Sequence, residues 1–339
     1  MSSNNDKANR FMRFLTASKD TVQLIENIKN KKVNAIPQGR FPIEGRSSLE
    51  GTQKRIAYLE DRLVKFEYLT GKKSFSDIGS LQGNIENYIG MSMVPTGIVG
   101  PLHVVGTDAN GDFYCPLATS EGALVASYDR GARASRMAGG ITSICLVEGV
   151  QRSPVFKFVN IAELGQFLIW VLPQIEKFRE ITSQNSNYAR LMDVRSNIEG
   201  NHLILTFEYL TGDAAGQNMV TICTDEICKY IVAESPVKPT FWFIEGNYSG
   251  DKKATALSFT TVRGKKVSSE VHIPKDIVTH ILKTTPQAMV DYWQSSTIGV
   301  IQSGAIGAQG HVANGLCALF IATGQDAACT AEAAVGITR

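Results

Sequence analysis

Residues 154–245 alternate between strand and helix patterns in an order that few folds can accommodate. Strand patterns cover 154–159, 188–197, 202–209 and 238–244, and helical patterns cover 161–180 and 216–233. The middle two strands form a predicted hairpin around Glu199-Gly200-Asn201. The resulting order, βαββαβ, is that of the split βαβ or ferredoxin-like arrangement. We therefore expect this segment to fold as a small independent domain.

The sequence on the two sides of this segment shares a composition rich in Gly, Ala and Ser. A predicted helix over 120–139 has so little side-chain bulk that it suits the centre of a tightly packed domain. We therefore predict an α+β protein with a large domain built from 83–153 and 246–339 around this helix. Residues 154–245 are inserted into the large domain, and residues 1–82 form a small helical N-terminal part.

Three further elements are predicted outside the insert. A helical period predicts a helix over 49–69, a second helical pattern covers 274–293, and 87–106 include a strand-like stretch. The apolar face of the first of these helices consists of Ile56, Leu59, Leu63 and Phe66.

The run GDAAGQN, residues 212–218, connects the hairpin to the second helix of the insert. Gly212 can adopt backbone angles that other residues avoid, and Gly216 removes a Cβ where a ligand or a strand would pass. The run lacks the GxGxxG spacing of a Rossmann fingerprint. Two interpretations stay open: a turn that lets a dinucleotide approach the backbone, and a glycine cap or hairpin with a structural role alone.

Charge and cysteine spacing exclude several function classes. The net charge of +2, without a basic stripe, argues against nucleic acid as the main partner. The six cysteines contain no CxxC pair, which favours reduced core thiols in a cytoplasmic protein and argues against a metal site. Apolar stretches fall short of the roughly 20 residues that span a bilayer, and the N-terminus lacks the apolar core of a secretory signal. We expect a cytoplasmic protein without a membrane segment.

Three charged residues lie in turn or small-residue contexts, each with an ordinary alternative. Glu121 lies at the predicted start of the helix over 120–139, where the helix dipole favours its charge and burial opposes it. An ordinary first-turn acidic residue is the alternative. Asp326 follows an apolar helix and has the alternative of a helix cap, while Lys252 has the alternative of a solvated turn lysine.

Five blocks occur in an order that resembles one enzyme family. Together they are more specific than any single glycine run. The chain resembles 3-hydroxy-3-methylglutaryl-coenzyme A (HMG-CoA) reductase in ENYIGMSMVPTGIVGPL (86–102), ATSEGALVASYDRGARA (118–134), GDAAGQNM (212–219), GNYSGDKKA (246–254) and HVANGLCALFIATGQDAA (311–328). The resemblance implies a helical N-terminal part, a large domain around a central helix, and an inserted ferredoxin-like domain that binds the nicotinamide cofactor.

The chemistry implied by the resemblance is the reduction of HMG-CoA to mevalonate and coenzyme A with two NADPH, in the mevalonate pathway. Lys252 matches the family's catalytic lysine, which stabilises a developing alkoxide. Glu121 matches the acid that delivers protons. Asp326 matches the aspartate that links these two residues and couples their titrations.

The resemblance also implies residues that bind substrate and cofactor. Substrate-binding positions are Arg152, Asn247, Asp251, Lys253 and Asn314. Cofactor-binding positions are Asp213, Ala215, Gly216, Gln217 and Asn218. The implied cofactor is NADPH, although Asn187 near the family's usual arginine for the 2′-phosphate leaves NADH possible. The implied partner is a second copy, in a homodimer or higher oligomer with a shared active site and residues 86–90 at the contact.

Departures from the family pattern generate further expectations. Glu245 replaces a serine of many members, which places a negative charge near the carboxylate of the substrate. Residues 294–297 lack a lysine found in animal-type members, which predicts a class I-like, divergent bacterial type.

The family continues beyond GQDAA with a glycine-rich cofactor segment, further helices and a late histidine that protonates the departing thiolate. The sequence ends at Arg339 before these parts, and His311 does not take that role, so we expect a C-terminally truncated chain. Two functions stay open: a reductase, and a catalytically impaired relative that acts as a binding or regulatory protein.

Overall fold

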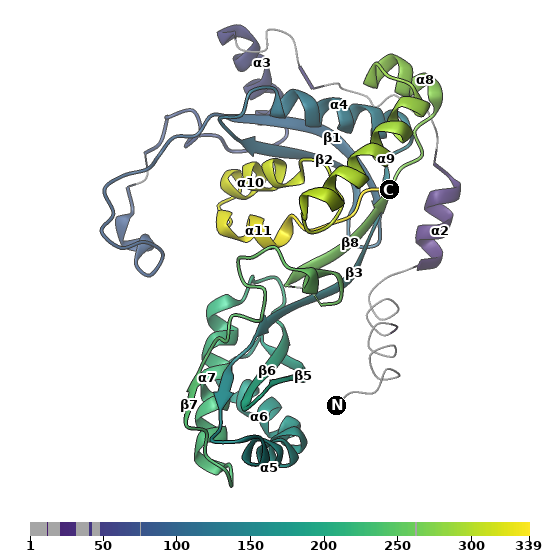
Figure 1. The fold of residues 1–339 in the computed structure, drawn as a ribbon. Coiled ribbons are helices and arrows are strands. Elements are labelled where there is room, and N and C mark those ends of the chain that lie inside the picture. Colours follow the sequence, from purple (N-terminus) through teal and green to yellow (C-terminus); the bar gives the residue numbers. More distant parts are fainter. Residues whose placement is uncertain (1–11, 13–20, 32–40, 43–47, 75, 262) are drawn as a thin grey trace.

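The computed structural model describes residues 12, 21–31, 41–42, 48–74, 76–261 and 263–339. The predicted N-terminal part therefore lies partly outside the described residues. Helices and a mixed sheet form an α+β structure, as predicted. Figure 1 shows two packed regions joined by the long strand β3 (Ile141–Arg152).

One mixed sheet of eight strands extends through both regions, in the order β2-β1-β3-β6-β4-β7, with β5 paired to β6 and β8 paired to β3. The first residues of β3 pair with β1 and β8, whereas its last three pair with β6, so β3 makes the sheet continuous. The other strands are β1 (Thr96–Gly106), β2 (Asn110–Ala118), β4 (Val155–Lys157), β5 (Arg190–Glu199), β6 (His202–Leu210), β7 (Phe241–Phe243) and β8 (Gly264–Glu270).

Between β4 and β7 the elements follow the predicted βαββαβ order. The strands lie in the order β7-β4-β6-β5, and each neighbouring pair is antiparallel. The first predicted helix is divided into α5 (Ile161–Val171) and α6 (Ile175–Asn185), because Pro173 occupies a 3-10 turn between them. The second is α7 (Gln217–Glu234). The predicted hairpin joins β5 to β6.

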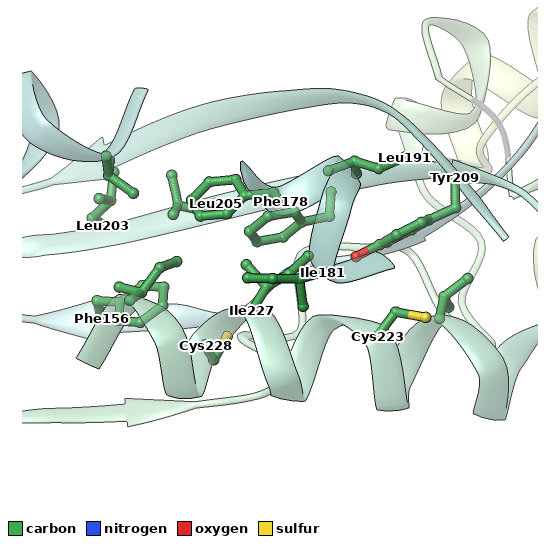
Figure 2. Close-up of a cluster of buried hydrophobic side chains, with 14 of the residues drawn as sticks. Phe156, Phe178, Ile181, Leu191, Leu203, Leu205, Tyr209, Cys223, Ile227 and Cys228 are labelled. Atoms are coloured by element: carbon green, nitrogen blue, oxygen red, sulfur yellow. The ribbon is translucent and has the colours of Figure 1, made fainter. Parts of the chain in front are cut away.

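A hydrophobic core lies between these strands and helices (Figure 2). Strand β6 supplies every second residue to the core, all 0% exposed: Leu203, Leu205, Phe207 and Tyr209. Helix α7 supplies residues three or four apart, likewise 0% exposed: Val220, Cys223, Ile227 and Ile231. The two periodicities recognised in the sequence therefore place both apolar faces inward.

A second core lies where α4 (Leu124–Met137) packs on β1 and approaches α10 (Val312–Ala322). Gly97 of β1 is required at this contact, because a Cβ there would lie 2.8 Å from Val125 Cγ2. Gly315 of α10 similarly leaves room for the ring of Tyr128. The small residues thus allow close approach, as predicted, but the outward face of α4 is exposed in the single chain.

Two predicted helices differ from the sequence pattern, one because it ends early and the other because it is interrupted. Helix α3 is Leu49–Glu60 instead of 49–69. Leu63, assigned to its apolar face, has a left-handed φ of 61° and is 91% exposed. The helix predicted over 274–293 is interrupted at Lys283, whose φ is 59°. Local turns that bend the backbone therefore override an apolar period that continues through them.

The break near residue 283 is marked in the sequence by a helix start, which the helical pattern over 274–293 did not reveal. Helix α9 (Pro286–Ser303) begins with proline, and the Thr285 side chain accepts a hydrogen bond from Ala288 N–H. A threonine cap followed by proline is a standard helix start. The remaining helices are α2 (Thr21–Lys29), α8 (Lys275–Ile277), the π-helical η4 (Val278–Leu282), α11 (Thr330–Ala333) and the 3-10 helices η1 (Ile78–Leu81), η2 (Leu172–Gln174), η3 (Ala256–Phe259) and η5 (Ala327–Cys329).

Two other boundaries also differ from prediction. Helix α4 begins at Leu124, so Glu121 precedes it instead of lying in its first turn. The strand-like stretch over 87–106 is a strand only from Thr96, and its earlier part is exposed, with Ile89 101% and Met93 97% exposed. In the described part of the chain, no helix has the length and apolar character needed to cross a membrane.

The hydrophobic core between β4 and β7 generates a stability prediction. Phe207→Ala should lower the free energy of unfolding by about 3–5 kcal/mol, because it removes a fully buried ring and leaves a cavity. Urea denaturation measures the change. Phe243→Ala is the control, since Phe243 is 60% exposed and its removal should have a much smaller effect. Equal losses in the two variants would contradict the proposed role of this core.

Candidate active site

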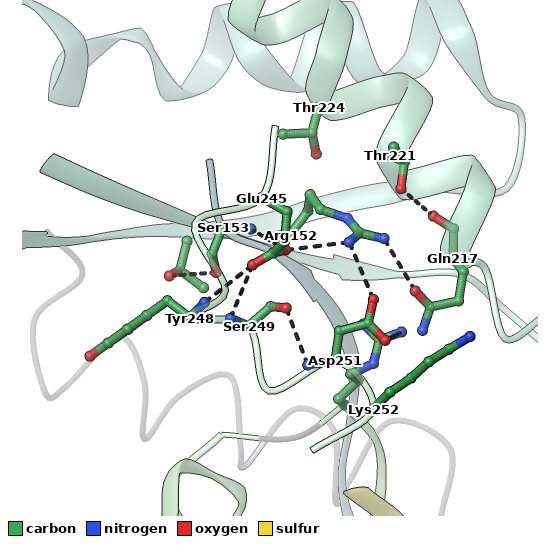
Figure 3. A network of polar contacts seen from close by, with 12 residues as sticks. Arg152, Ser153, Gln217, Thr221, Thr224, Glu245, Tyr248, Ser249, Asp251 and Lys252 are labelled. Atoms are coloured by element: carbon green, nitrogen blue, oxygen red, sulfur yellow. Dashed lines mark hydrogen bonds and ion pairs between the residues drawn. The ribbon is translucent and has the colours of Figure 1, made fainter. Parts of the chain in front are cut away.

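Arg152, the last residue of β3, lies at the centre of a polar network (Figure 3). Its side chain is 10% exposed. Nη1 lies 3.3 Å from Glu245 Oε2 and 3.4 Å from Asp251 Oδ2, and Nη2 donates to Gln217 Oε1 over 3.2 Å. The network therefore brings together predicted substrate-binding residues and one predicted cofactor-binding residue.

Glu245 shapes the loop that follows β7. Its Oε1 accepts hydrogen bonds from the backbone N–H groups of Tyr248 (3.2 Å) and Ser249 (3.5 Å), and its Oε2 accepts one from Ser153 N–H (3.3 Å). The sequence predicted an extra negative charge near the carboxylate of the substrate at this position. In the structure, the charge is paired with Arg152, so Glu245 ties the loop to the end of β3.

The loop carries the other predicted substrate-binding residues. Asn247 is exposed and left-handed, with a φ of 62°. Asp251 is half-buried next to Arg152, while Lys253 is exposed and donates from Nζ to the Asp251 backbone carbonyl over 2.9 Å. Lys252 is also left-handed, with a φ of 54°. Three positive φ values, including that of Gly250, give this loop its tight course.

Lys252 Nζ lies 2.9 Å from Asp326 Oδ2, and the two side chains are 49% and 52% exposed. The hydrogen bond with Asp326 raises the pKa of Lys252 above its ordinary value. The same bond, together with one from Ala328 N–H, lowers the pKa of Asp326. Asp326 therefore caps η5, as the structural interpretation expected, and it also makes the lysine contact, which is one of the two contacts that the resemblance implies.

Glu332 and Arg263, which were not predicted from the sequence, make charged contacts next to Lys252. Glu332 accepts a 2.6 Å hydrogen bond from the Lys252 backbone N–H, and its carboxylate lies 2.8 Å from Arg263 Nε. Arg263 Nη2 also lies 3.0 Å from Asp251 Oδ1. Neither residue lies in one of the blocks that carried the resemblance, and nothing in their local patterns distinguishes them from surface charges.

Cys329 lies next to these acidic residues. Burial, reinforced by the charges of Glu332 and Asp326, raises the pKa of its thiol to about 11. A thiol with this pKa is protonated at neutral pH and is a weak nucleophile.

Glu121 belongs to a separate group of residues. Asn314 Nδ2 donates to Glu121 Oε1 over 3.1 Å, and Tyr128 Oη donates to Asn314 Oδ1 over 3.4 Å. Burial raises the pKa of Tyr128. The predicted link from Asp326 to Glu121 is not present as a hydrogen bond among the described residues: Asp326 contacts Lys252, Ala328 and Cys329 instead.

Helix α10 explains the separation between the two groups. Asn314 is in its first turn, whereas Asp326 follows its last residue, Ala322. An 11-residue helix is about 16 Å long. Glu121 and the Lys252–Asp326 pair therefore lie near opposite ends of α10 within one chain.

The GDAAGQN turn precedes α7. Gly216 is the left-handed N-cap, with a φ of 72°, and a Cβ there would lie 2.6 Å from Thr211 Cβ. Asp213, Ala215 and Asn218 are exposed around it. Gly216 is therefore a glycine cap, which is the structural interpretation of this turn. The N–H groups in the first turn of α7 lack intrahelical partners and suit an anionic ligand, which the dinucleotide interpretation requires.

The family follows from comparison with known proteins. Residues 51–339 match the model of the family described as hydroxymethylglutaryl-coenzyme A reductase. The chain belongs to this family. A reductase of this name from Pyrococcus horikoshii is 38% identical over 320 residues, which cover 93% of the chain and 76% of the relative. The Pyrococcus abyssi reductase is 42% identical over 319 residues, with 93% and 77% coverage.

A solved structure supports the fold. The class II HMG-CoA reductase from Streptococcus pneumoniae, described as bound to NADPH in open conformations, superposes with a TM-score of 0.62 at 17% identity. The match covers 83% of this chain and 73% of the other. The class I-like, bacterial type that the sequence suggested stays a prediction, because these relatives are archaeal and this structural neighbour is class II.

The ion pair at Lys252 generates a prediction for this HMG-CoA reductase family member. Asp326→Asn should lower the pKa of Lys252 toward 10.5, because it removes the acceptor that stabilises the ammonium group. An NMR titration of the lysine side chain measures this shift. Lys229, whose pKa is raised by Asp225 and Glu226, is the internal control and should not change.

The effect on stability has a defined pH window. The pKa of Asp326 is lowered below 3.8 and that of Lys252 is raised above 10.5, so the contribution of the pair is present between pH 3.8 and 10.5. It is lost as pH falls through the lowered pKa of Asp326 or rises through the raised pKa of Lys252. Solvent screening of these half-exposed side chains limits the contribution to about 1 kcal/mol or less. An unchanged Lys252 pKa in Asp326→Asn would contradict the role of Asp326 as the acceptor that stabilises the Lys252 ammonium group.

Proposed function

We propose that this chain reduces HMG-CoA to mevalonate and coenzyme A with two NADPH, a step of the mevalonate pathway. The observation that carries this proposal is the family match over residues 51–339, combined with the ion pair between Asp326 and Lys252, whose neighbour Asp251 contacts Arg152. Relatives named HMG-CoA reductase, which are at least 37% identical in Pyrococcus and Aeropyrum pernix, support it.

Lys252 supplies the positive charge that the reaction requires. Reduction of a thioester carbonyl places negative charge on its oxygen, and a fixed cation stabilises that charge. The raised pKa keeps Lys252 protonated, and its side chain is half-exposed, which suits contact with a substrate. Glu121 is the proposed proton donor. Arg152, Asn247, Asp251, Lys253 and Asn314 are the proposed substrate contacts.

The proposed cofactor site is the start of α7. NADPH supplies the hydride, and the residues proposed to hold it are Asp213, Ala215, Gly216, Gln217 and Asn218. The positive end of an 18-residue helix and its unpaired N–H groups suit a pyrophosphate. Arg152 donates a hydrogen bond to Gln217 and contacts Asp251, so it connects this site to the loop that follows β7. We propose residues 154–245 as the inserted cofactor-binding domain, while the class I-like type stays a prediction from the sequence.

A shared active site is part of the proposal. Within one chain, Glu121 and the Lys252–Asp326 pair lie near opposite ends of α10. A homodimer in which one subunit supplies Glu121 and the other supplies Lys252 would unite them. The exposed apolar side chain of Ile89, within residues 86–90 expected at the contact, supports this arrangement, as do the exposed Met91 and Met93 that follow it. A cytoplasmic location stays a prediction.

Lys252→Ala tests the proposed chemistry. Substrate-dependent oxidation of NADPH should fall by about 10²–10³-fold in kcat, as when one oxyanion donor is removed. Lys177→Ala is the matched control, because Lys177 is an exposed lysine of α6 and should leave kcat unchanged. Turnover that survives Lys252→Ala would overturn the mechanism. A wild-type chain that binds HMG-CoA without turnover would support the alternative of a binding or regulatory relative.

Gly216→Ala tests the cofactor site. Gly212 and Gly216 both have positive φ, but only at Gly216 would a Cβ meet neighbouring atoms within 4 Å. Gly216→Ala should therefore distort the start of α7 and raise the Kd for NADPH by about tenfold, which corresponds to roughly 1.4 kcal/mol. Gly212→Ala, the matched variant, should raise it less. Fluorescence titration of NADPH measures both, and equal effects would argue against the start of α7 as the binding site.

A further inference from the structure

One short segment, residues 326–332, contacts both the side chain and the backbone N–H of Lys252. Asp326 Oδ2 lies 2.9 Å from Lys252 Nζ, and Glu332 Oε2 accepts a 2.6 Å hydrogen bond from Lys252 N–H. Glu332 and Lys252 are 80 residues apart in the sequence. The side chain and the backbone of the lysine are thus fixed by the same distant part of the chain.

The backbone of Lys252 requires such support. Its φ of 54° lies in the left-handed region, which a residue with a side chain adopts only when its surroundings enforce it. A carboxylate that accepts the N–H of this residue enforces the conformation through a charge-assisted hydrogen bond.

Glu332 is buried and paired with Arg263. Its side chain is 7% exposed, and its carboxylate lies 2.8 Å from Nε of Arg263, whose side chain is 5% exposed. Arg263 also lies 3.0 Å from Asp251 Oδ1, on the residue before Lys252. The guanidinium therefore lies within ion-pair distance of both the Glu332 carboxylate and the loop that carries Lys252. Its hydrogen bond is to Glu332, through Nε, whereas the contact with Asp251 is an ion pair without a hydrogen bond.

We propose that Glu332 is a positioning residue for Lys252, with Arg263 as its anchor. Together they keep the lysine backbone in the left-handed conformation from which Nζ reaches Asp326. The effect on catalysis rests on the proposed function, whereas the effect on the Lys252 backbone does not. Glu332 itself acts through Lys252 and has no role in substrate binding.

Two variants separate the parts of this interaction. Glu332→Gln keeps a carbonyl oxygen that can accept the Lys252 N–H but removes the charge that pairs with Arg263, and Glu332→Ala removes both. We expect kcat to fall about tenfold in the first and about a hundredfold in the second, with the KM for HMG-CoA near its wild-type value. Glu176→Gln removes one carboxylate of the exposed Glu176–Arg179 pair on α6 and is the matched control, with unchanged kcat.

A second measurement is independent of turnover. In ¹⁵N-lysine-labelled protein, the Lys252 amide proton should resonate downfield because of its short bond to a carboxylate. It should move upfield in Glu332→Gln and Glu332→Ala, and it should stay in place in Glu176→Gln.

The outcomes distinguish this inference from the proposed function. A wild-type chain without turnover would contradict the proposed function, and the amide resonance would still decide the role of Glu332. An unmoved Lys252 amide in folded Glu332→Gln, or wild-type kcat in folded Glu332→Ala, would overturn the inference. If Glu332→Ala does not fold, Glu332→Gln tests the inference alone. Its Lys252 amide should move upfield, and its kcat should fall while its KM for HMG-CoA stays near the wild-type value.

Discussion

The candidate active site depends on one buried guanidinium, that of Arg152. It contacts Glu245 and Asp251, which belong to the loop that follows β7, and Gln217 at the start of α7. A buried charge is stable only when it is paired and hydrogen-bonded, so these segments are bound to a common position. Because Arg152 is also the last residue of β3, the sheet itself sets where the proposed substrate and cofactor residues meet.

The proposed catalytic lysine is held by a second set of charges. Asp326 pairs with its side chain, and Glu332 accepts its backbone N–H. Arg263 joins Glu332 to Asp251, which in turn contacts Arg152, so the two sets are continuous. Paired charges of this kind add little net stability compared with apolar packing, but they define a geometry. That property suits a site whose lysine must meet a developing negative charge at a defined point.

Much of the fold was predictable because local periodicity coincides with burial. Strand β6 buries alternate residues and α7 buries residues three or four apart, and both patterns are visible in the sequence. The prediction failed where the same period continued past the end of an element. Leu63 matches the helical period of α3, yet it lies in a turn, because a favourable apolar spacing does not by itself extend a helix. The start of α9 at Pro286 was visible in the sequence as a cap and proline, and was missed.

The sequence by itself determined the family, the βαββαβ order of the insert and the candidate residues, because ordered motifs and periodic patterns are local properties of the chain. Only the tertiary structure decided which of those residues meet. It paired Lys252 with Asp326 and placed Glu121 with Asn314 at the other end of α10. It also revealed Glu332 and Arg263, whose burial and charge pairing depend on contacts between segments about 70 to 80 residues apart. Such contacts leave no local pattern, since each partner alone resembles an ordinary surface charge.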